Sequence, residues 1–325
     1  MLPFTFTKAV DEKSALAAAR PGARYIAGGT TLVDLMRETV ERPSVVIDIN
    51  ALPYRQIELG PTKLKIGSLV RMSELAAHPG VRSEFPVIAQ ALEHSASAQL
   101  RNMASIGGNL LQRPRCLYFR DVSAACNRRD PGSGCSAING VNRSHAILGT
   151  SAVCVATHPS DLAVALVALD AVVIARDATG ERQIPVARFF RQPGDTPDQE
   201  HDLRPAELIV AVEVPTGPEM RRSGYLKVRD RQSYEFALAS AAVAMDIGGG
   251  AVRAARVAVG GVATVPWRLP AVEQALVGRP VGDGLFKSAS MRAADGAKPL
   301  SGNAFKVELV KRTVERELAT VAAMR

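Results

Sequence analysis

The first part of the chain alternates short β-branched runs with amphipathic segments, a pattern typical of an α/β unit. A short strand predicted at 24–27 leads through Gly-Gly-Thr-Thr into a segment that places Leu32, Leu35 and Met36 on one helical face. The β-branched run 44–49 predicts a return strand. Further elements predicted here are a strand at 64–67, a helix opened by Ser73 and a helix from about 86 to 98.

The later part of the chain changes character after a break at 215–218, where two prolines and a glycine interrupt the pattern. Before the break, Ser160 is a suitable N-cap for a helix. After it, Gly248-Gly249-Gly250 predicts a hairpin turn between two long strands. The other predicted elements are strands at 171–176, 208–214, 225–229, 238–247 and 252–262, and helices at about 269–277 and from 303 to the C-terminus.

Length and composition indicate two globular domains. The 325 residues exceed the usual size of one hydrophobic core, and 47% apolar with 22% charged residues excludes a largely disordered chain. No apolar stretch approaches the roughly 20 residues of a membrane-spanning helix, and the N-terminus has no secretion-signal layout. The net charge of +8 comes from scattered Lys and Arg without a nucleic-acid-binding signature, so we expect no nucleic-acid partner.

The four cysteines all fall within one short stretch. Cys116, Cys126, Cys135 and Cys154 follow the spacing C-x9-C-x8-C-x18-C, which fits neither a zinc finger nor a ferredoxin run. The turn-rich segment 127–134 allows distant thiols to converge on one centre. Spacing alone favours a metal or iron–sulfur centre and leaves open two disulfides or buried free thiols. It does not decide between iron and zinc.

Two Gly-Gly turns are candidate phosphate sites. A strand, Gly28-Gly29-Thr30 and a helix start together present free backbone N–H groups, and 105–109 supplies a second such element. Neither matches a dinucleotide or P-loop fingerprint, so an ordinary turn stays open for the first. The histidines form no hydrolytic arrangement: His94 and His145 lack partner motifs, and His158 precedes a proline in a helix cap.

Four short motifs occur in a fixed order along the chain. They are Ile26-Ala27-Gly28-Gly29-Thr30-Thr31-Leu32, Ser105-Ile106-Gly107-Gly108-Asn109-Leu110, Thr157-His158-Pro159-Ser160-Asp161 and Lys227-Val228-Arg229-Asp230-Arg231. In this order the chain resembles, over essentially its whole length, the FAD-binding medium subunits of the xanthine dehydrogenase/molybdenum hydroxylase family. The residues around the first cysteine and 131–135 are similar to the branch of bacterial periplasmic aldehyde oxidoreductases whose FAD subunit holds a [4Fe-4S] cluster.

The resemblance implies an α+β fold with two domains. An α/β FAD-binding domain of the PCMH/VAO type would span 1–217, with subdomains at about 1–55 and 56–217 and a cluster loop at about 112–156. A C-terminal domain of antiparallel sheet plus helices would span 218–325.

The resemblance also assigns site residues. The first motif would wrap the FAD pyrophosphate, the second would approach FAD, Asp161 would hydrogen-bond it, and Lys227 would lie by the isoalloxazine. Thr31 stands where the family often has Asp, which weakens the assignment for that side chain. The implied FAD residues are Ile26, Ala27, Gly28, Gly29, Thr30, Thr31, Leu32, Val33, Ser105, Gly108, Asn109, Asp161, Ile209, Val210 and Lys227, and the implied cluster ligands are Cys116, Cys126, Cys135 and Cys154.

The expected function is that of an electron-transfer subunit in a heterotrimeric molybdenum aldehyde oxidoreductase, which converts aldehyde to carboxylate. A large molybdenum-cofactor subunit and a small [2Fe-2S] subunit would be partners, and an external acceptor would take the electrons from FAD. The family branch implies that the protein reaches the periplasm by co-export with a partner subunit. Without such co-export, we expect it in the cytoplasm. The alternatives are a xanthine dehydrogenase or 4-hydroxybenzoyl-CoA reductase type of enzyme, or a metal-binding protein without flavin.

Overall fold

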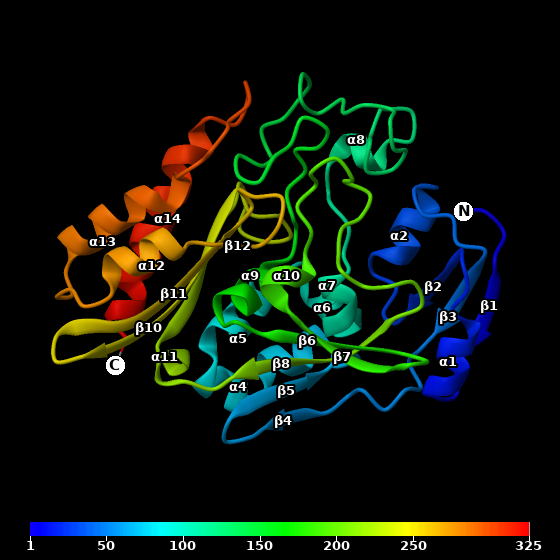
Figure 1. The fold of residues 1–325 in the computed structure, drawn as a ribbon, viewed down its shortest axis with the longest axis horizontal. Helices are drawn as coiled ribbons and strands as arrows, with labels where there is room; N and C mark the ends of the chain where they lie inside the picture. The colour runs from blue at the N-terminus through cyan, green and yellow to red at the C-terminus, as the bar shows by residue number, and fades with distance from the viewer. Residues whose placement is uncertain (325) are drawn as a thin grey trace.

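The computed structural model describes residues 1–324, which fold into three sheets arranged side by side along the long axis (Figure 1). The first is a three-stranded parallel sheet of order β1-β3-β2 near the N-terminus. Two helices connect its strands, and Val46 and Ile47 of the central strand are fully buried. Its elements are β1 (Thr5–Lys8), α1 (Glu12–Ala18), β2 (Ala23–Ile26), α2 (Leu32–Arg37) and β3 (Val45–Asp48).

The second sheet is antiparallel and lies in the middle of the molecule, in the order β4-β5-β8-β6-β7. Its strands are β4 (Ile57–Leu59), β5 (Lys63–Gly67), β6 (Val172–Asp177), β7 (Gly180–Pro185) and β8 (Leu208–Pro215). The helices that follow β5 or flank this sheet are α3 (Met72–Ala77), α4 (Pro79–Glu84), α5 (Pro86–Glu93), α6 (Ala98–Met103), α7 (Ile106–Leu110), α9 (Asp161–Ala168) and α10 (Val186–Phe189).

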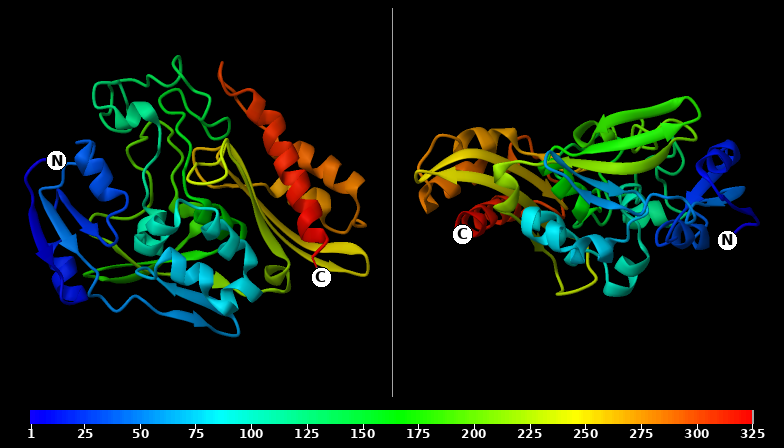
Figure 2. Two further views of the ribbon diagram at one scale, coloured as in Figure 1. Left: turned by 180° about the vertical axis from the view of Figure 1, so that it is seen from behind. Right: turned by 90° about the horizontal axis from the view of Figure 1, so that it is seen from below.

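The third sheet is antiparallel, in the order β12-β11-β10-β9, and the C-terminal helices cover one of its faces (Figure 2). Alternate residues explain its two-sided packing: Ala241 and Val243 join the core beneath those helices, whereas Ala242 and Ala244 join the core of α5 and α9. Its elements are α11 (Pro218–Arg221), β9 (Ser223–Val228), β10 (Ala239–Gly248), β11 (Ala251–Gly260), β12 (Trp267–Arg268), α12 (Pro270–Leu276), α13 (Asp283–Ser290), a 3-10 turn (Met291–Ala294) and α14 (Phe305–Ala322).

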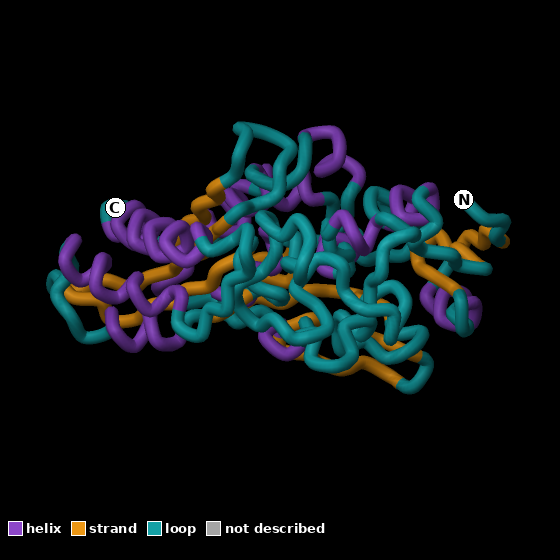
Figure 3. The backbone as a smooth tube through the Cα atoms, turned by 90° about the horizontal axis from the view of Figure 1, so that it is seen from above, coloured by secondary structure: helices purple, strands orange, loops and turns teal. Residues whose placement is uncertain are grey.

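Residues 112–156, which we call the cysteine loop, form a long excursion between α7 and α9 above the central sheet (Figure 1). Its one regular element is α8 (Leu117–Arg120). Seen from above, loop segments cover the middle of the molecule between the C-terminal helices and the N-terminal strands (Figure 3). Near its end the loop packs Ile147 and Leu148 into the C-terminal core, so it bridges separate parts of the fold.

The α+β class and most of the predicted elements are confirmed, but the helix predicted from 86 to 98 is wrong in its extent. The helix α5 ends at Glu93, and Ala96, whose φ of 47° lies in the left-handed region, prevents it from continuing. Ser97 then accepts a hydrogen bond from Leu100 N at 3.3 Å and caps a separate helix, α6. The elements that the sequence pattern missed are β1, β4, β7, β12, α1, α4, α6, α7, α8, α10, α11, α13 and the 3-10 turn.

Candidate cofactor sites

The first glycine loop, residues 26–33 between β2 and α2, presents a run of unpaired backbone donors. Within residues 1–324, the N–H groups of residues 28 to 32 have no hydrogen-bond acceptor. Thr31 precedes the helix without capping it through its side chain. Consecutive free N–H groups at a helix start favour an anion, so this loop suits a phosphate.

The second glycine loop, residues 102–110, lies directly against the first. A Cβ at Gly28 would overlap the carbonyl oxygen of Met103, so the glycine lets the two backbones meet. Arg71 donates to the same carbonyl and, at 3.0 Å, to Asn50, which in turn donates to Ala27 O at 2.9 Å. The structure therefore brings together two motifs that are about 75 residues apart in sequence.

Most of the second loop's own donors are occupied. Ser105 caps α7 by accepting from Gly108 N at 3.2 Å, and Gly107 N donates to Ser68 O at 2.8 Å. The Asn109 side chain accepts from Ser160 Oγ at 2.6 Å. Because Ser160 also caps α9, this bond links the second loop to the helix that begins with Asp161.

Asp161 is buried and holds three donors. Its carboxylate accepts from Tyr225 Oη at 2.6 Å, from Ser95 Oγ at 3.0 Å and from Lys227 Nζ at 2.8 Å. The Lys227 side chain is 1% exposed and also donates to His94 O. Burial, followed by the nearby Asp161 charge, raises the pKa of Tyr225 well above its usual value, so the phenol stays protonated.

Ser95 and Tyr225 belong to this site but are not among the site residues predicted from the sequence. Tyr225 carried a usable signal, because it lies two residues before Lys227 and strand periodicity places both on one face. Ser95 carried none, since its contact with Asp161 depends on tertiary packing.

Ile209 and Val210 lie in β8 beneath the second glycine loop, with 3% and 4% of their surface exposed. A register shift in β8 lets Val210 O accept from Ser68 N at 3.0 Å, and Ser68 O holds Gly107. Val210 therefore supports the loop through Ser68, and Ile209 is its buried neighbour in β8.

A cavity of about 360 Å³ opens beside Asp161. Its wall combines the start of α9, the third sheet through Tyr225 and Gly260, and the cysteine loop through Cys116 and His145. Burial lowers the pKa of His145 to about 4, so this imidazole is neutral near pH 7, and its Nε2 lies 3.1 Å from Cys116 Sγ. The cavity thus connects the Asp161 site to the cysteines.

All four cysteines are free thiols and line one enclosed space within the cysteine loop. Cys126 and Cys135 face each other across an isolated antiparallel bridge. Burial raises the pKa of Cys116 to about 11 and also raises that of Cys135, although backbone N–H groups of the following residues oppose the shift. Cys116 lines both this space and the larger cavity.

The donors around this space are not gathered tightly enough for one metal ion. Among residues 1–324, no three His, Cys, Asp or Glu side chains meet at a single ion-sized point. One zinc ion needs four ligand atoms at about 2.0–2.3 Å, whereas a [4Fe-4S] cluster takes one thiolate at each of its four irons. Buried Arg128 also lines the space. Its Nε has no hydrogen-bond acceptor among residues 1–324. Four cysteines around one space are the kind of donor set that an iron–sulfur cluster would take.

Two facing glycine loops, one of them with free backbone N–H groups at a helix start, are the geometry of a protein that binds a phosphate-bearing cofactor. The FAD binding domain in molybdopterin dehydrogenase matches residues 3–217, and the CO dehydrogenase flavoprotein C-terminal domain matches 224–321. The chain belongs to the family of FAD-binding medium subunits of molybdenum hydroxylases, and it is a subunit of an oxidoreductase. This membership excludes the alternative of a metal-binding protein without flavin.

Individual relatives agree with this family. The aldehyde oxidoreductase FAD-binding subunit PaoB of Escherichia coli K12 is 46% identical over 99% of both chains. The glyceraldehyde dehydrogenase medium chain of Sulfolobus acidocaldarius is 26% identical over 98% of both chains. Among solved structures, carbon monoxide dehydrogenase of Hydrogenophaga pseudoflava superposes with a TM-score of 0.77 at 24% identity over 99% of both chains, which shows a shared fold.

One feature of the described chain bears on the membrane. None of the helices within residues 1–324 combines the length and apolar character that a bilayer crossing needs.

Proposed function

We propose that this chain is the FAD- and [4Fe-4S]-binding electron-transfer subunit of a heterotrimeric molybdenum aldehyde oxidoreductase, which converts aldehyde to carboxylate. The observation that carries the proposal is the position of Cys116, which lines both the four-cysteine space and the cavity beside Asp161. A redox centre held by the cysteines would therefore adjoin a flavin held by the glycine loops.

The flavin part of the proposal assigns the first glycine loop to the pyrophosphate. Its free N–H groups would donate to phosphate oxygens at the start of α2, and the second loop would form the facing wall. Asp161 would orient the cofactor while Tyr225 and Ser95 hold its carboxylate, and the Lys227 ammonium would add positive charge nearby. When bound, FAD accepts two electrons and passes them on.

The cluster part of the proposal assigns the ligands to Cys116, Cys126, Cys135 and Cys154. The backbone N–H groups near Cys116 and Cys135 would hydrogen-bond the sulfurs, as is common around iron–sulfur clusters. Because unligated Cys116 is a protonated thiol near pH 7, ligation would release its proton and would make affinity pH-dependent.

The proposed partners follow from what the chain lacks and from its relatives. All four cysteines belong to one site, so no thiol remains for a [2Fe-2S] centre. We assign the [2Fe-2S] centres to a small partner and the molybdenum cofactor to a large partner, with an external acceptor for electrons from FAD. The aldehyde substrate is proposed because the PaoB relative, 46% identical over 99% of both chains, is an aldehyde oxidoreductase subunit.

The remaining parts of the proposal concern organisation and location. The FAD-binding domain would span 1–217, with subdomains at about 1–55 and 56–217, and the C-terminal domain 218–325. We place the assembled enzyme in the periplasm by co-export with a partner subunit. Fractionation of cells that express all three subunits tests the location, since activity confined to the cytoplasm would contradict it.

The test of the function is reconstitution. The purified chain should carry flavin and iron but oxidise no aldehyde, whereas the chain with both partners should reduce a dye or quinone with an aldehyde as donor. Aldehyde turnover by the chain alone would overturn the subunit assignment. Turnover of the complex with purines or aromatic acyl-CoA but not with aldehydes would instead support the xanthine dehydrogenase or 4-hydroxybenzoyl-CoA reductase alternative.

A further inference from the structure

A buried arginine accompanies the four cysteines. Arg128 follows Cys126 by two residues, lines the same enclosed space and is 5% exposed. One guanidinium nitrogen, Nη2, donates to Cys154 Sγ at 3.6 Å. A buried guanidinium therefore lies against the sulfur of one of the four cysteines.

A chain of ion pairs holds the Arg128 guanidinium in place. Nη1 of Arg128 pairs with Glu200 at 3.2 Å, and Glu200 also accepts from Arg113 Nε at 2.7 Å. Arg113 is ion-paired with Glu41 and lies over the Phe119 ring at 4.6 Å. The orientation of Arg128 is therefore fixed by residues from three separate segments of the chain.

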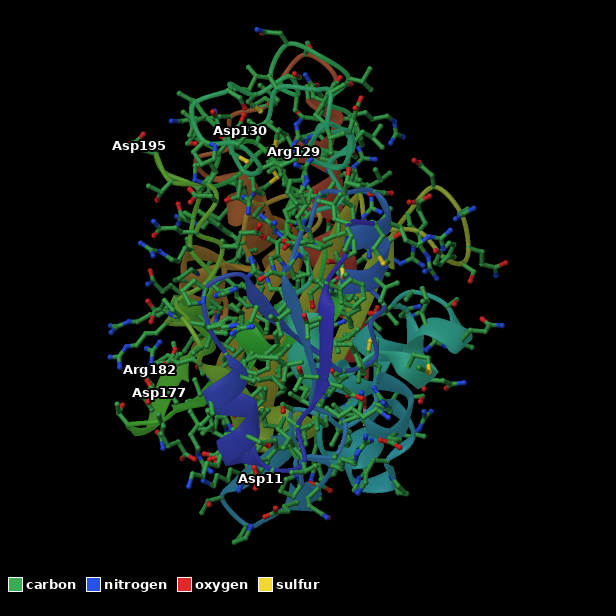
Figure 4. The ribbon with its side chains drawn as sticks, turned by 90° about the vertical axis from the view of Figure 1, so that its right-hand side faces the viewer. Asp11, Arg129, Asp130, Asp177, Arg182 and Asp195 are labelled. Carbon is green, nitrogen blue, oxygen red and sulfur yellow. The ribbon has the colours of Figure 1, made fainter. Side chains whose placement is uncertain are left out.

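The picture of the side chains agrees with this arrangement. In Figure 4, Arg129 and Asp130 of the cysteine loop lie at the same end of the molecule as Asp195, which belongs to the segment that carries Glu200. The acidic anchor and the loop thus reach the same region from positions some 70 residues apart in sequence.

We propose that Arg128 is a positioning residue that sets the reduction potential of the cluster through its hydrogen bond to the Cys154 sulfur. This inference rests on the proposed [4Fe-4S] ligation. A cluster held by four thiolates becomes more negative when it gains an electron, and a buried cation that donates to one thiolate stabilises this reduced form. Arg128 therefore raises the potential and makes the cluster easier to reduce.

The geometry requires arginine rather than any cation. The planar guanidinium reaches Glu200 with one nitrogen and Cys154 with another, as its fixed fork allows. A lysine ammonium is a single compact donor on a flexible stem, so it cannot span both acceptors in the same way. Arg128→Lys therefore keeps the charge but weakens the sulfur contact.

The test is a redox titration of the cluster followed by electron paramagnetic resonance in the purified full chain. Arg128→Gln should shift the potential to more negative values by at least about 59 mV, a tenfold change for a one-electron couple. Arg128→Lys should shift it in the same direction by less. The matched control is Arg120→Gln, in the same loop, because Arg120 pairs with Asp34 and Glu38 and contacts no sulfur. This control should titrate like the wild type.

The outcomes separate this inference from the proposed function. If the wild-type chain shows no [4Fe-4S] signal and no matching iron and sulfide content, the proposed ligation fails. If the wild type carries the cluster and both Arg128 variants titrate at the wild-type potential, the ligation stands and the role of Arg128 is overturned. If Arg128→Gln loses its iron, the reduction potential of the cluster in Arg128→Lys becomes the test. A wild-type potential in Arg128→Lys would then reject the role of Arg128.

Discussion

Gly28 and Met103 are in backbone contact, and this contact joins the two glycine loops of the proposed flavin site. A Cβ at Gly28 would overlap the Met103 carbonyl oxygen, which lies at the end of α6 and accepts a hydrogen bond from Arg71. Gly28→Ala should therefore push the loops apart and lower FAD affinity by at least about tenfold, or ~1.4 kcal/mol. Flavin absorbance after gel filtration measures the loss.

Two further glycine variants complete this test. Gly29→Val should also lose FAD, because Gly29 has a φ of 70° that a β-branched residue adopts poorly. Gly249→Ala is the matched control, since its φ is 63° and open space surrounds it in the β10–β11 hairpin. Stoichiometric FAD in Gly28→Ala or Gly29→Val would contradict the assignment of the first glycine loop.

Lys227→Ala should leave FAD bound but move the flavin midpoint potential to more negative values. The lysine is a buried cation on Asp161, and its removal takes away positive charge that would stabilise anionic reduced flavin. Asp161 keeps Tyr225 and Ser95 as donors, so the fold should survive. Potentiometric titration of the flavin gives the readout, and an unchanged potential would count against the proposed place of Lys227.

A surface lysine provides the control for this variant. Lys63 is about half exposed and pairs with Glu213 at 2.7 Å on the central sheet. Exposed pairs of this kind contribute about 0–1 kcal/mol. Lys63→Ala should therefore change neither the flavin potential nor FAD content.

Replacing any one of the four cysteines by serine should lower the iron and sulfide content and destabilise the cysteine loop. Ligation of a cluster is also folding free energy, so the loss should raise the sensitivity of 112–156 to limited proteolysis. Iron analysis and mass spectrometry of the fragments measure both effects. Ser123→Ala, in the same loop but bonded only to Asp121, is the control. Full iron and sulfide in all four serine variants would end the cluster proposal.

Glu317 on α14 should make unfolding pH-dependent. Burial raises the pKa of this carboxyl to about 8 from the usual 4.5, and Arg316 only partly opposes the shift. Between these values the folded chain keeps a proton that the unfolded chain releases, so the carboxyl's contribution to stability falls as pH rises from about 4.5 to 8. Glu317→Gln stays neutral, so the variant should gain stability over the wild type by up to roughly 1.36 kcal/mol for each pH unit in this window.

Urea unfolding at several pH values measures this difference. The matched control is Glu308→Gln on the same helix, because Glu308 is exposed and its pKa is lowered through its hydrogen bond with Lys311. This control should not gain stability as pH rises from 4.5 to 8. A constant difference between wild type and Glu317→Gln across the window would show that the carboxyl ionises normally in the folded chain.

Much of the fold could be predicted because local patterns determine it. The strand, glycine turn and helix from 23 to 37 are encoded by adjacent residues, and Ser160 caps α9 as expected. The break after Glu93 was missed because Ala96 is a helix former by propensity, and only its packed position imposes a positive φ.

Less of the site could be predicted because its contacts are long-range. The sequence gives the order of the four motifs, but the bond from Ser160 to Asn109 and the ion pair of Asp161 with Lys227 exist only after the three sheets assemble. Glu200 lies in a Pro- and Gly-rich loop that has no local signal of function. Its role beside Arg128 becomes visible only in three dimensions.

The cysteine loop has a consequence for how the protein matures in the cell. The loop contacts three other parts of the chain. Arg120 pairs with Asp34 of α2, Ser144 O accepts from Lys306 of α14, and Arg128 pairs with Glu200 of the 191–205 segment. On the proposed ligation, iron insertion would lock all three attachments at once, and Ser144 of one attachment lines the cavity beside Asp161. Cells short of iron would then accumulate a chain with intact hydrophobic cores but poor flavin loading, so the supply of one cofactor would govern acquisition of the other.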